Sequence, residues 1–284
     1  MKSLKAWLLC FLFLPSFGLA QEEVPYDRLE NRVYALTDGV GLVMDVFTPK
    51  GEKNGLAIID VLSGAWFSEQ GQVNDHIKGQ MFNIYCSRGY TVFMVRPGSR
   101  TLFTADRMVD HIQKGIAYIK DHAEEFGIDP DRIGITGASA GGHLTLMTLV
   151  AVNSNPDLKL KTGAVFFPPT DFIDYGGKTA SFERIGDILF SGGVEGHSEE
   201  EVKKKAEELS PALQVKEALP PVLLIHGDAD PAVPLQQSEK MLKVLEEAGG
   251  QAKLIVKPGG GHPWPTIPEE VALMADWFDE HLKN

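Results

Sequence analysis

Residues 137–143, Gly-Ala-Ser-Ala-Gly-Gly-His, are the stretch of sequence that decides the fold. The apolar run 132–136 before it is typical of a buried strand, and the apolar residues 143–150 at its end are typical of a buried helix. A serine between glycines at a strand-to-helix turn is the nucleophile-elbow pattern. Such a turn has no room for side chains at its two glycines, and it lifts the serine hydroxyl above the sheet edge. We therefore predict that Ser139 is a nucleophile, although a bare motif of this kind also arises by chance in glycine-rich turns.

Outward from this turn, short apolar runs alternate with helical patterns. The expected strands are 33–36, 42–47, 56–62, 90–95, 132–136, 164–167, 222–225 and 252–256, and the expected helices are 73–86, 106–126, 143–150, 235–248 and a last one that ends near 281. Asp38-Gly39 predicts a hairpin between the first two strands, whereas residues 21–31 are acidic and aperiodic and are expected to form a surface arm. The alternation predicts one α/β domain over residues 21–284, with a mostly parallel sheet of about eight strands and helices on both faces.

One segment of this domain lacks a clear pattern. Residues 172–220 are the least regular part of the chain, and we expect them to form an irregular cap or insertion over the site. Within them, the charged run 199–208 is typical of a solvated helix face.

Residues 1–20 have the composition of a secretory signal peptide. Lys2 and Lys5 give a basic start, residues 6–17 are almost continuously apolar, and residues 18–20 are small enough for a cleavage site. The apolar run is too short to span a bilayer comfortably. We therefore expect cleavage before Gln21 and a secreted or periplasmic protein.

The net charge of the chain excludes several classes of partner. The full chain has 27 basic and 39 acidic residues and a formal charge of −12, which becomes −14 when Lys2 and Lys5 are removed with the signal peptide. Such a surface repels phosphate backbones and anionic lipids, so we expect neither a nucleic-acid partner nor, after cleavage, a membrane partner.

Cys86 is the cysteine left after cleavage, so no internal disulfide is expected, and its apolar neighbours favour a buried thiol.

A serine nucleophile needs a base within hydrogen-bonding reach and a carboxylate that orients the base. His262 is the best candidate base, because it follows the last strand on a loop with three glycines at 259–261. His226, at a strand end, is a weaker rival that is expected to shape its turn. Asp230 and Asp228 compete for the role of carboxylate, and either also fits a helix cap. His143 is expected to pack in the first turn of its helix, and the remaining histidines, His76, His111, His122, His197 and His281, are expected to be solvated.

The reaction also needs N–H donors for a developing oxyanion. The backbone N–H of Ala140, at the start of the helix after the elbow, is expected to supply one donor. The loop that follows strand 56–62 reaches the same sheet edge, where Gly64, Ala65 or Trp66 is expected to supply the other. Four aromatic residues are candidate walls of the substrate pocket and fit the core equally well: Trp66, Phe67, Phe103 and Trp264.

Taken together, these motifs resemble the α/β-hydrolase superfamily over about residues 33–281. The resemblance rests on 129–133 (Asp-Pro-Asp-Arg-Ile), the elbow, 210–212 (Ser-Pro-Ala), 226–234 (His-Gly-Asp-Ala-Asp-Pro-Ala-Val-Pro) and 261–262 (Gly-His). The chain is most similar to the carboxylesterase, acetyl-xylan esterase and feruloyl-esterase-like branch, which is related to the catalytic domains of prolyl oligopeptidase-type enzymes. The resemblance implies Ser139, Asp230 and His262 as the triad, with Asp230 rather than Asp228 as the acid. It implies neither a metal nor an organic cofactor.

This family resemblance implies a secreted serine esterase that forms an acyl-enzyme, with acetyl or feruloyl esters of plant polysaccharide as substrates. The chain departs from the family at the oxyanion loop, where the usual His-Gly-Gly-Gly-Trp reads Leu-Ser-Gly-Ala-Trp at 62–66. Losing the histidine removes one hydrogen bond that braces the loop. Two alternatives are a prolyl oligopeptidase-like serine peptidase and a non-catalytic binding protein on the same fold. The peptidases usually carry a large accessory domain, for which the expected mature chain has no room.

Overall fold

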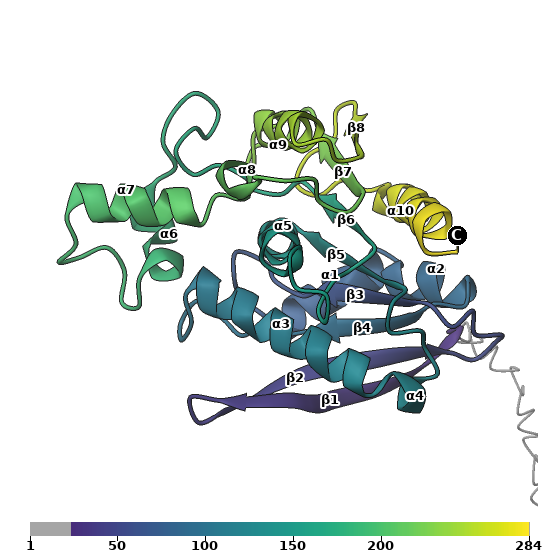
Figure 1. Cartoon of the computed structure of the whole chain (residues 1–284). Coiled ribbons are helices and arrows are strands. Elements are labelled where there is room, and N and C mark those ends of the chain that lie inside the picture. The colour runs from purple at the N-terminus through teal and green to yellow at the C-terminus, as the bar shows by residue number, and fades with distance from the viewer. Residues whose placement is uncertain (1–23, 284) are drawn as a thin grey trace, which may run out of the picture.

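An open, mostly parallel sheet forms the centre of the protein (Figure 1). The computed structural model describes residues 24–283, in which eight strands lie in the order β1-β2-β4-β3-β5-β6-β7-β8. β2 is antiparallel to β1 and β4, and the other neighbouring strands are parallel. The strands are β1 Tyr26–Thr37, β2 Val40–Pro49, β3 Ala57–Val61, β4 Thr91–Val95, β5 Ile133–Ala138, β6 Thr162–Phe166, β7 Val222–Gly227 and β8 Ala252–Lys257. This confirms the predicted fold class, while the predicted signal peptide lies outside the described residues.

Helices cover both faces of the sheet, because side chains of the central strands alternate between two buried faces. Ile59 and Val95 pack in one core with α3 and α5, whereas Ile58 and Met94 pack in the other with α2 and α10. In residues 24–283 the helices are α1 Gln70–Lys78, α2 Met81–Ser87, α3 Ala105–Asp121, α4 Ala123–Phe126, α5 Ala140–Val152, α6 Phe182–Leu189, α7 Glu199–Glu208, α8 Pro211–Gln214, α9 Gln236–Glu247 and α10 Ile267–Leu282. No helix in this part of the chain is long and apolar enough to cross a bilayer.

Cys86 lies in the core on the α2 side of the sheet, as predicted. Burial raises the pKa of its thiol to about 12, so the sulfur stays protonated at neutral pH.

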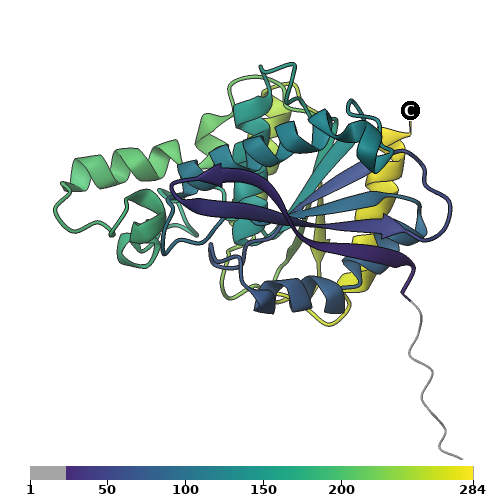
Figure 2. The same ribbon diagram turned by 90° about the horizontal axis from the view of Figure 1, so that it is seen from below.

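The predicted hairpin is present, but its first strand begins earlier than expected. Asp38 and Gly39 both have positive φ, which matches the tight turns that join twisted antiparallel strands. β1 already begins at Tyr26, so much of the expected surface arm is strand (Figure 2). The polar residues of β1 made this part of the strand look like a surface loop in the sequence. Arg28, however, pairs with the buried carboxylate of Asp45 on β2 rather than with solvent. The strand has two register shifts, one of them between Leu29 and Arg32.

Two expected helices are each broken into a pair. The 73–86 pattern is α1 and α2, separated at Gly79 and Gln80, where Gln80 adopts the left-handed conformation with φ 60°. The 106–126 pattern is α3 and α4, separated at His122, and α4 ends at Gly127 with φ 67°. Hydrophobic periodicity continues across both breaks, so the pattern alone did not reveal them.

The expected cap, residues 172–220, contains α6, α7 and α8 and is therefore more regular than predicted. α6 and α7 extend from the sheet on one side (Figure 2). The run 199–208 is helical as predicted, and Ser198 and Glu201 form its capping box. Most of α7 is exposed, while Val202 and Ala206 are buried.

Two glycines bring the loops after β7 and β8 together. A Cβ added to Gly227 would overlap the backbone of Gly260, and the N–H of Ala229 donates to the C=O of Gly260 at 3.0 Å. The absence of a side chain at Gly227 therefore sets how closely the Asp230 loop approaches the His262 loop.

We predict that Gly227→Ala lowers the free energy of unfolding by about 1–3 kcal/mol, the usual range for overpacking. The added methyl group would overlap the backbone of Gly260, which cannot move aside easily. Urea denaturation measures this change. Gly71→Ala is the matched control, because a Cβ at Gly71, in the first turn of α1, has no neighbour within 4 Å. Equal stability of the two variants would contradict this role of Gly227.

Candidate active site

The elbow at Ser139 joins β5 to α5 in a strained turn. Ser139 has φ 55° and ψ −119°, a conformation that non-glycine residues rarely adopt. A Cβ on Gly137 would lie 2.5 Å from the backbone of Gly141, and one on Gly141 would overlap the C=O of Val61 on β3. Glycine is therefore required on both sides of the serine, as predicted.

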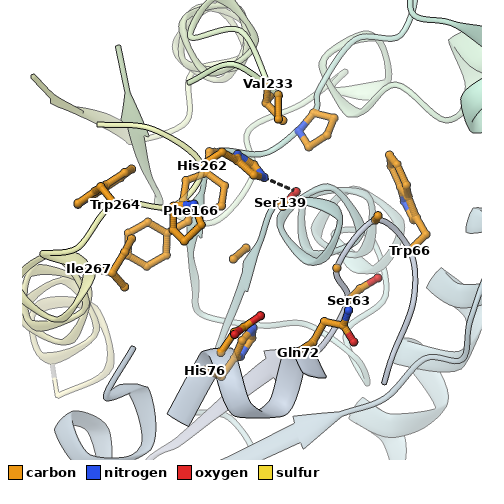
Figure 3. Close-up of a pocket in the computed structure, with 18 of the residues that line it drawn as sticks. Ser63, Trp66, Gln72, His76, Ser139, Phe166, Val233, His262, Trp264 and Ile267 are labelled. Carbon is orange, nitrogen blue, oxygen red and sulfur yellow. Dashed lines mark hydrogen bonds between the residues drawn. The ribbon is translucent and has the colours of Figure 1, made fainter. Parts of the chain in front are cut away.

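Ser139, His262 and Asp230 form a continuous chain of hydrogen bonds. The Ser139 hydroxyl lies 2.9 Å from His262 Nε2 (Figure 3). His262 Nδ1 lies 2.6 Å from Asp230 Oδ2. The carboxylate accepts from Nδ1–H, which leaves Nε2 unprotonated and able to accept the serine proton. The structure thus brings the three predicted residues together from three different loops at the carboxyl edge of the sheet.

The two competing aspartates have separate places. Asp228 is exposed, and its Oδ1 accepts from the backbone N–H of Gly259 at 2.6 Å, so it braces the His262 loop. The Asp230 side chain is fully buried, and its Oδ1 accepts from the N–H groups of Ala232 and Val233. Only Asp230 reaches the imidazole of His262, which agrees with the family resemblance.

The surroundings of Asp230 favour its charged form. Burial alone opposes ionisation, but hydrogen bonds from His226, His262 and the backbone outweigh it and hold the pKa of Asp230 well below its usual value. His226 Nε2 lies 2.9 Å from the C=O of Val233 and 3.5 Å from Asp230 Oδ2. His226 is therefore buried behind the acid, where it shapes the turn as predicted and does not reach Ser139.

Two histidines that were expected to be solvated lie in buried contacts. His111 is fully buried, with Nδ1 2.7 Å from the C=O of Pro97, because it lies on the inner face of α3. His76 on α1 pairs with Asp60 on β3 at 2.7 Å, and its side chain is 10% exposed. Sequence reasoning missed both residues, although a carboxylate at Asp60 inside an apolar strand is itself a signal of a buried partner.

The oxyanion loop has fewer free donors than predicted. Gly64 is excluded, because its N–H donates to the C=O of Phe67 at 2.9 Å within the loop. The N–H groups of Ala65 and Trp66 have no acceptor in the described part of the chain, and both residues have positive φ. Ala140 N–H opens α5 and also lacks an acceptor within residues 24–283. Three of the four predicted donors are thus available.

A different histidine braces this loop. Trp66 Nε1–H donates to Nδ1 of His143 at 3.2 Å, and His143 Nε2 lies 2.8 Å from the C=O of Leu209. His143 is fully buried in the first turn of α5, as predicted. Burial lowers its pKa to about 4 despite the carbonyl of Leu209, so the ring is neutral and can accept from Trp66. The Trp66–His143 contact holds the loop that lacks the family's usual histidine.

A cavity of about 900 Å³ opens at Ser139 and His262 (Figure 3). Trp66 and Trp264 line it, as predicted. The other two expected wall residues do not. Phe103 is buried against His111 and the backbone of Gly98, and Phe67 lies under the guanidinium of Arg100.

The fold and this site place the protein among the α/β-hydrolases. The BD-FAE family model matches residues 44–245, so the chain belongs to that family. It is similar to "Uncharacterized peptidase YuxL" of Bacillus subtilis (25% identity, 89% of this chain, 39% of the relative) and to "Isoprenylcysteine alpha-carbonyl methylesterase ICME" of Arabidopsis thaliana (26%, 56% and 40%). The chain thus spans about two fifths of the length of these curated relatives.

Among solved structures, the fold is similar to a truncated form of a carbohydrate esterase from gut microbiota. The TM-score is 0.79 at 23% sequence identity, and the match covers 92% of this chain and 99% of that chain. At this identity the similarity supports the fold.

We predict that His143 makes the protein less stable in mild acid. Below about pH 6.5 the unfolded chain binds a proton at this histidine, whereas the folded protein resists protonation down to about pH 4. The free energy of unfolding should therefore fall by about 3 kcal/mol more in the wild type than in His143→Gln as the pH drops across this window. Urea denaturation at several pH values measures the two slopes, and identical slopes would contradict the neutral, buried imidazole.

Proposed function

We propose that this protein is a serine esterase that hydrolyses carboxylic esters through an acyl-enzyme. Ser139 Oγ attacks the ester carbonyl while its proton passes to His262 Nε2. Asp230 orients His262 and stabilises the imidazolium that forms. The N–H groups of Ala140 and of Ala65 or Trp66 stabilise the oxyanion of the tetrahedral intermediate.

The tetrahedral intermediate collapses when His262 returns the proton to the leaving alcohol, which leaves the acyl group on Ser139. A water molecule then attacks this acyl ester and gives its proton to His262. The second collapse releases the carboxylic acid and restores the Ser139 hydroxyl. The observation that carries this proposal is the hydrogen-bonded Ser139–His262–Asp230 chain at the wall of the cavity.

We further propose acetyl or feruloyl esters of plant polysaccharide as the substrates and export by a signal peptide at residues 1–20. Membership of the BD-FAE family and the similarity in fold to a carbohydrate esterase support this substrate class. The composition of residues 1–20 supports export. A cavity of about 900 Å³ is within the usual size of small-molecule sites.

A serine peptidase is the second candidate, favoured by the similarity to YuxL, whose name describes it as an uncharacterized peptidase. The same triad cleaves amides, so substrate preference distinguishes the two functions. A panel of acetyl, butyryl, feruloyl and long-chain esters should be hydrolysed faster than a chromogenic dipeptide amide. A higher kcat/KM for the amide would overturn the esterase proposal in favour of a peptidase.

We predict that Ser139→Ala lowers kcat/KM for p-nitrophenyl acetate at least about a thousandfold, because the nucleophile is lost. A fluorophosphonate probe should label the wild type at Ser139, as mass spectrometry of the labelled peptide would detect. Unchanged activity in the variant, or absence of labelling in a folded wild type, would indicate a non-catalytic protein on this fold.

The two aspartates allow a matched test of the acid. Asp230→Asn should lower kcat/KM about a thousandfold or more, because the imidazole loses the acceptor that fixes its tautomer. Asp228→Asn makes the same chemical change two residues away and keeps an acceptor oxygen for Gly259 N–H, so we expect a loss below about tenfold. Equal losses in the two variants would be inconsistent with Asp230 as the triad acid.

A further inference from the structure

A second histidine–aspartate pair faces the same cavity as the triad. His76 on α1 lines the cavity, and Figure 3 places it across the cavity from His262, beside Gln72. Its Nδ1 lies 2.7 Å from Oδ2 of Asp60 on β3. The mechanism above uses neither residue.

Asp60 occupies an unusual place for a carboxylate. It lies next to the last residue of β3, paired with Met94 of β4 on one side and Thr136 of β5 on the other, and it is fully buried. One carboxylate oxygen contacts His76, and the other has no hydrogen-bond partner in the described residues. A buried carboxylate destabilises a fold unless a partner compensates for its lost hydration. Asp60 therefore depends on His76, and its position fixes the orientation of the imidazole.

His76 presents an unused ring nitrogen, Nε2, to the cavity. Nδ1–H is used by Asp60, and Nε2 has no hydrogen-bond partner within residues 24–283. Burial alone would lower the pKa of His76, but the charge and hydrogen bond of Asp60, together with the charge of Asp75, raise it above the usual value, which favours the doubly protonated ring. In that state Nε2 carries a proton, and the side chain keeps 10% of its surface exposed.

The surroundings of His76 restrict what it can recognise. The cavity wall around His76 combines the apolar side chains of Met81, Trp264 and Ile267 with three polar residues of α1, Gln72, Asp75 and Lys78. The His76–Asp60 pair is neutral overall, so it offers one directed N–H donor rather than net positive charge. A single directed donor beside the apolar side chains of this wall suits one uncharged acceptor oxygen, such as a hydroxyl, on an otherwise apolar group.

We propose that His76, positioned by Asp60, donates a hydrogen bond from Nε2 to a hydroxyl oxygen of the bound ester and so determines specificity for hydroxyl-bearing substrates. This inference rests on the proposed function of the Ser139 site. The hydroxyl belongs either to the acyl group or to the alcohol, and the two arms of the test separate these sources.

The acyl arm compares methyl 4-hydroxycinnamate with methyl cinnamate, and the alcohol arm compares trans-4-hydroxycyclohexyl acetate with cyclohexyl acetate. The readout is the ratio of kcat/KM for the hydroxylated ester to that for its partner. In one arm the wild type should prefer the hydroxylated ester, and His76→Phe should reduce that ratio about tenfold, because the donor is lost. His76→Gln keeps an N–H donor and should retain part of the preference.

A matched control distinguishes loss of the donor from a general effect of replacing a histidine. His122 at the end of α3 contacts the C=O of Tyr118 and does not line the cavity. His122→Phe and His122→Gln should therefore keep the wild-type ratio in both arms. Ratios unchanged by His76→Phe in both arms would overturn the proposal, as would ratios that the His122 variants change equally.

Binding to Ser139→Ala separates this inference from the catalytic proposal and needs no substitution at His76. In that variant, NMR of the imidazole nitrogens should show a larger shift of His76 Nε2 with the hydroxylated ester of the responding arm than with its partner. Equal shifts would overturn the inference even if Ser139 is the nucleophile. Asp60→Asn should lower the titration midpoint of His76, and an unchanged midpoint would contradict the positioning role of Asp60.

Discussion

The hydrogen bond between Asp230 and His262 is the interaction on which the site depends, because it joins loops that follow two different strands. It requires that these loops meet, and the close approach of Gly227 and Gly260 allows them to do so. It also requires an ionised acid, which the backbone N–H groups around Asp230 and the nearby His226 favour. Parallel pairing of β5, β6, β7 and β8 places all of these loops at one edge, close to the Ser139 turn.

In the oxyanion loop, other hydrogen bonds replace the one that the family's usual histidine provides. Leu62 stands where the family usually has the histidine, yet the loop is fastened at several points. Ser63 C=O accepts from Gly141 N–H, the Trp66 indole donates to His143, and Trp66 C=O accepts from Arg100 N–H. The contacts of Gly141 and His143 connect the loop directly to α5, the helix that follows the elbow, so the donors and the nucleophile share one support.

Much of the fold and the core of the site followed from the sequence, because they depend on local patterns. Continuous apolar runs predict buried parallel strands, and the glycines around Ser139 predict a tight turn whatever the rest of the chain does. The features that were missed depend on contacts distant in sequence. The first strand is held by ion pairs of Arg28, Gly64 N–H is used by Phe67, and the burial of His76 follows from Asp60. The periodic pattern of apolar residues along the chain carries no information about such pairings.

The register shifts of β1 have a consequence for how the molecule behaves in concentrated solution. β1 is an edge strand, and its exposed apolar side chains, Leu29, Val33 and Leu36, would make a straight strand a template for pairing with another chain. The shifts interrupt the regular row of N–H and C=O groups, and the charges of Arg28 and Arg32 lie along the same strand. The hairpin at this edge of the sheet thus also protects the protein against edge-to-edge aggregation.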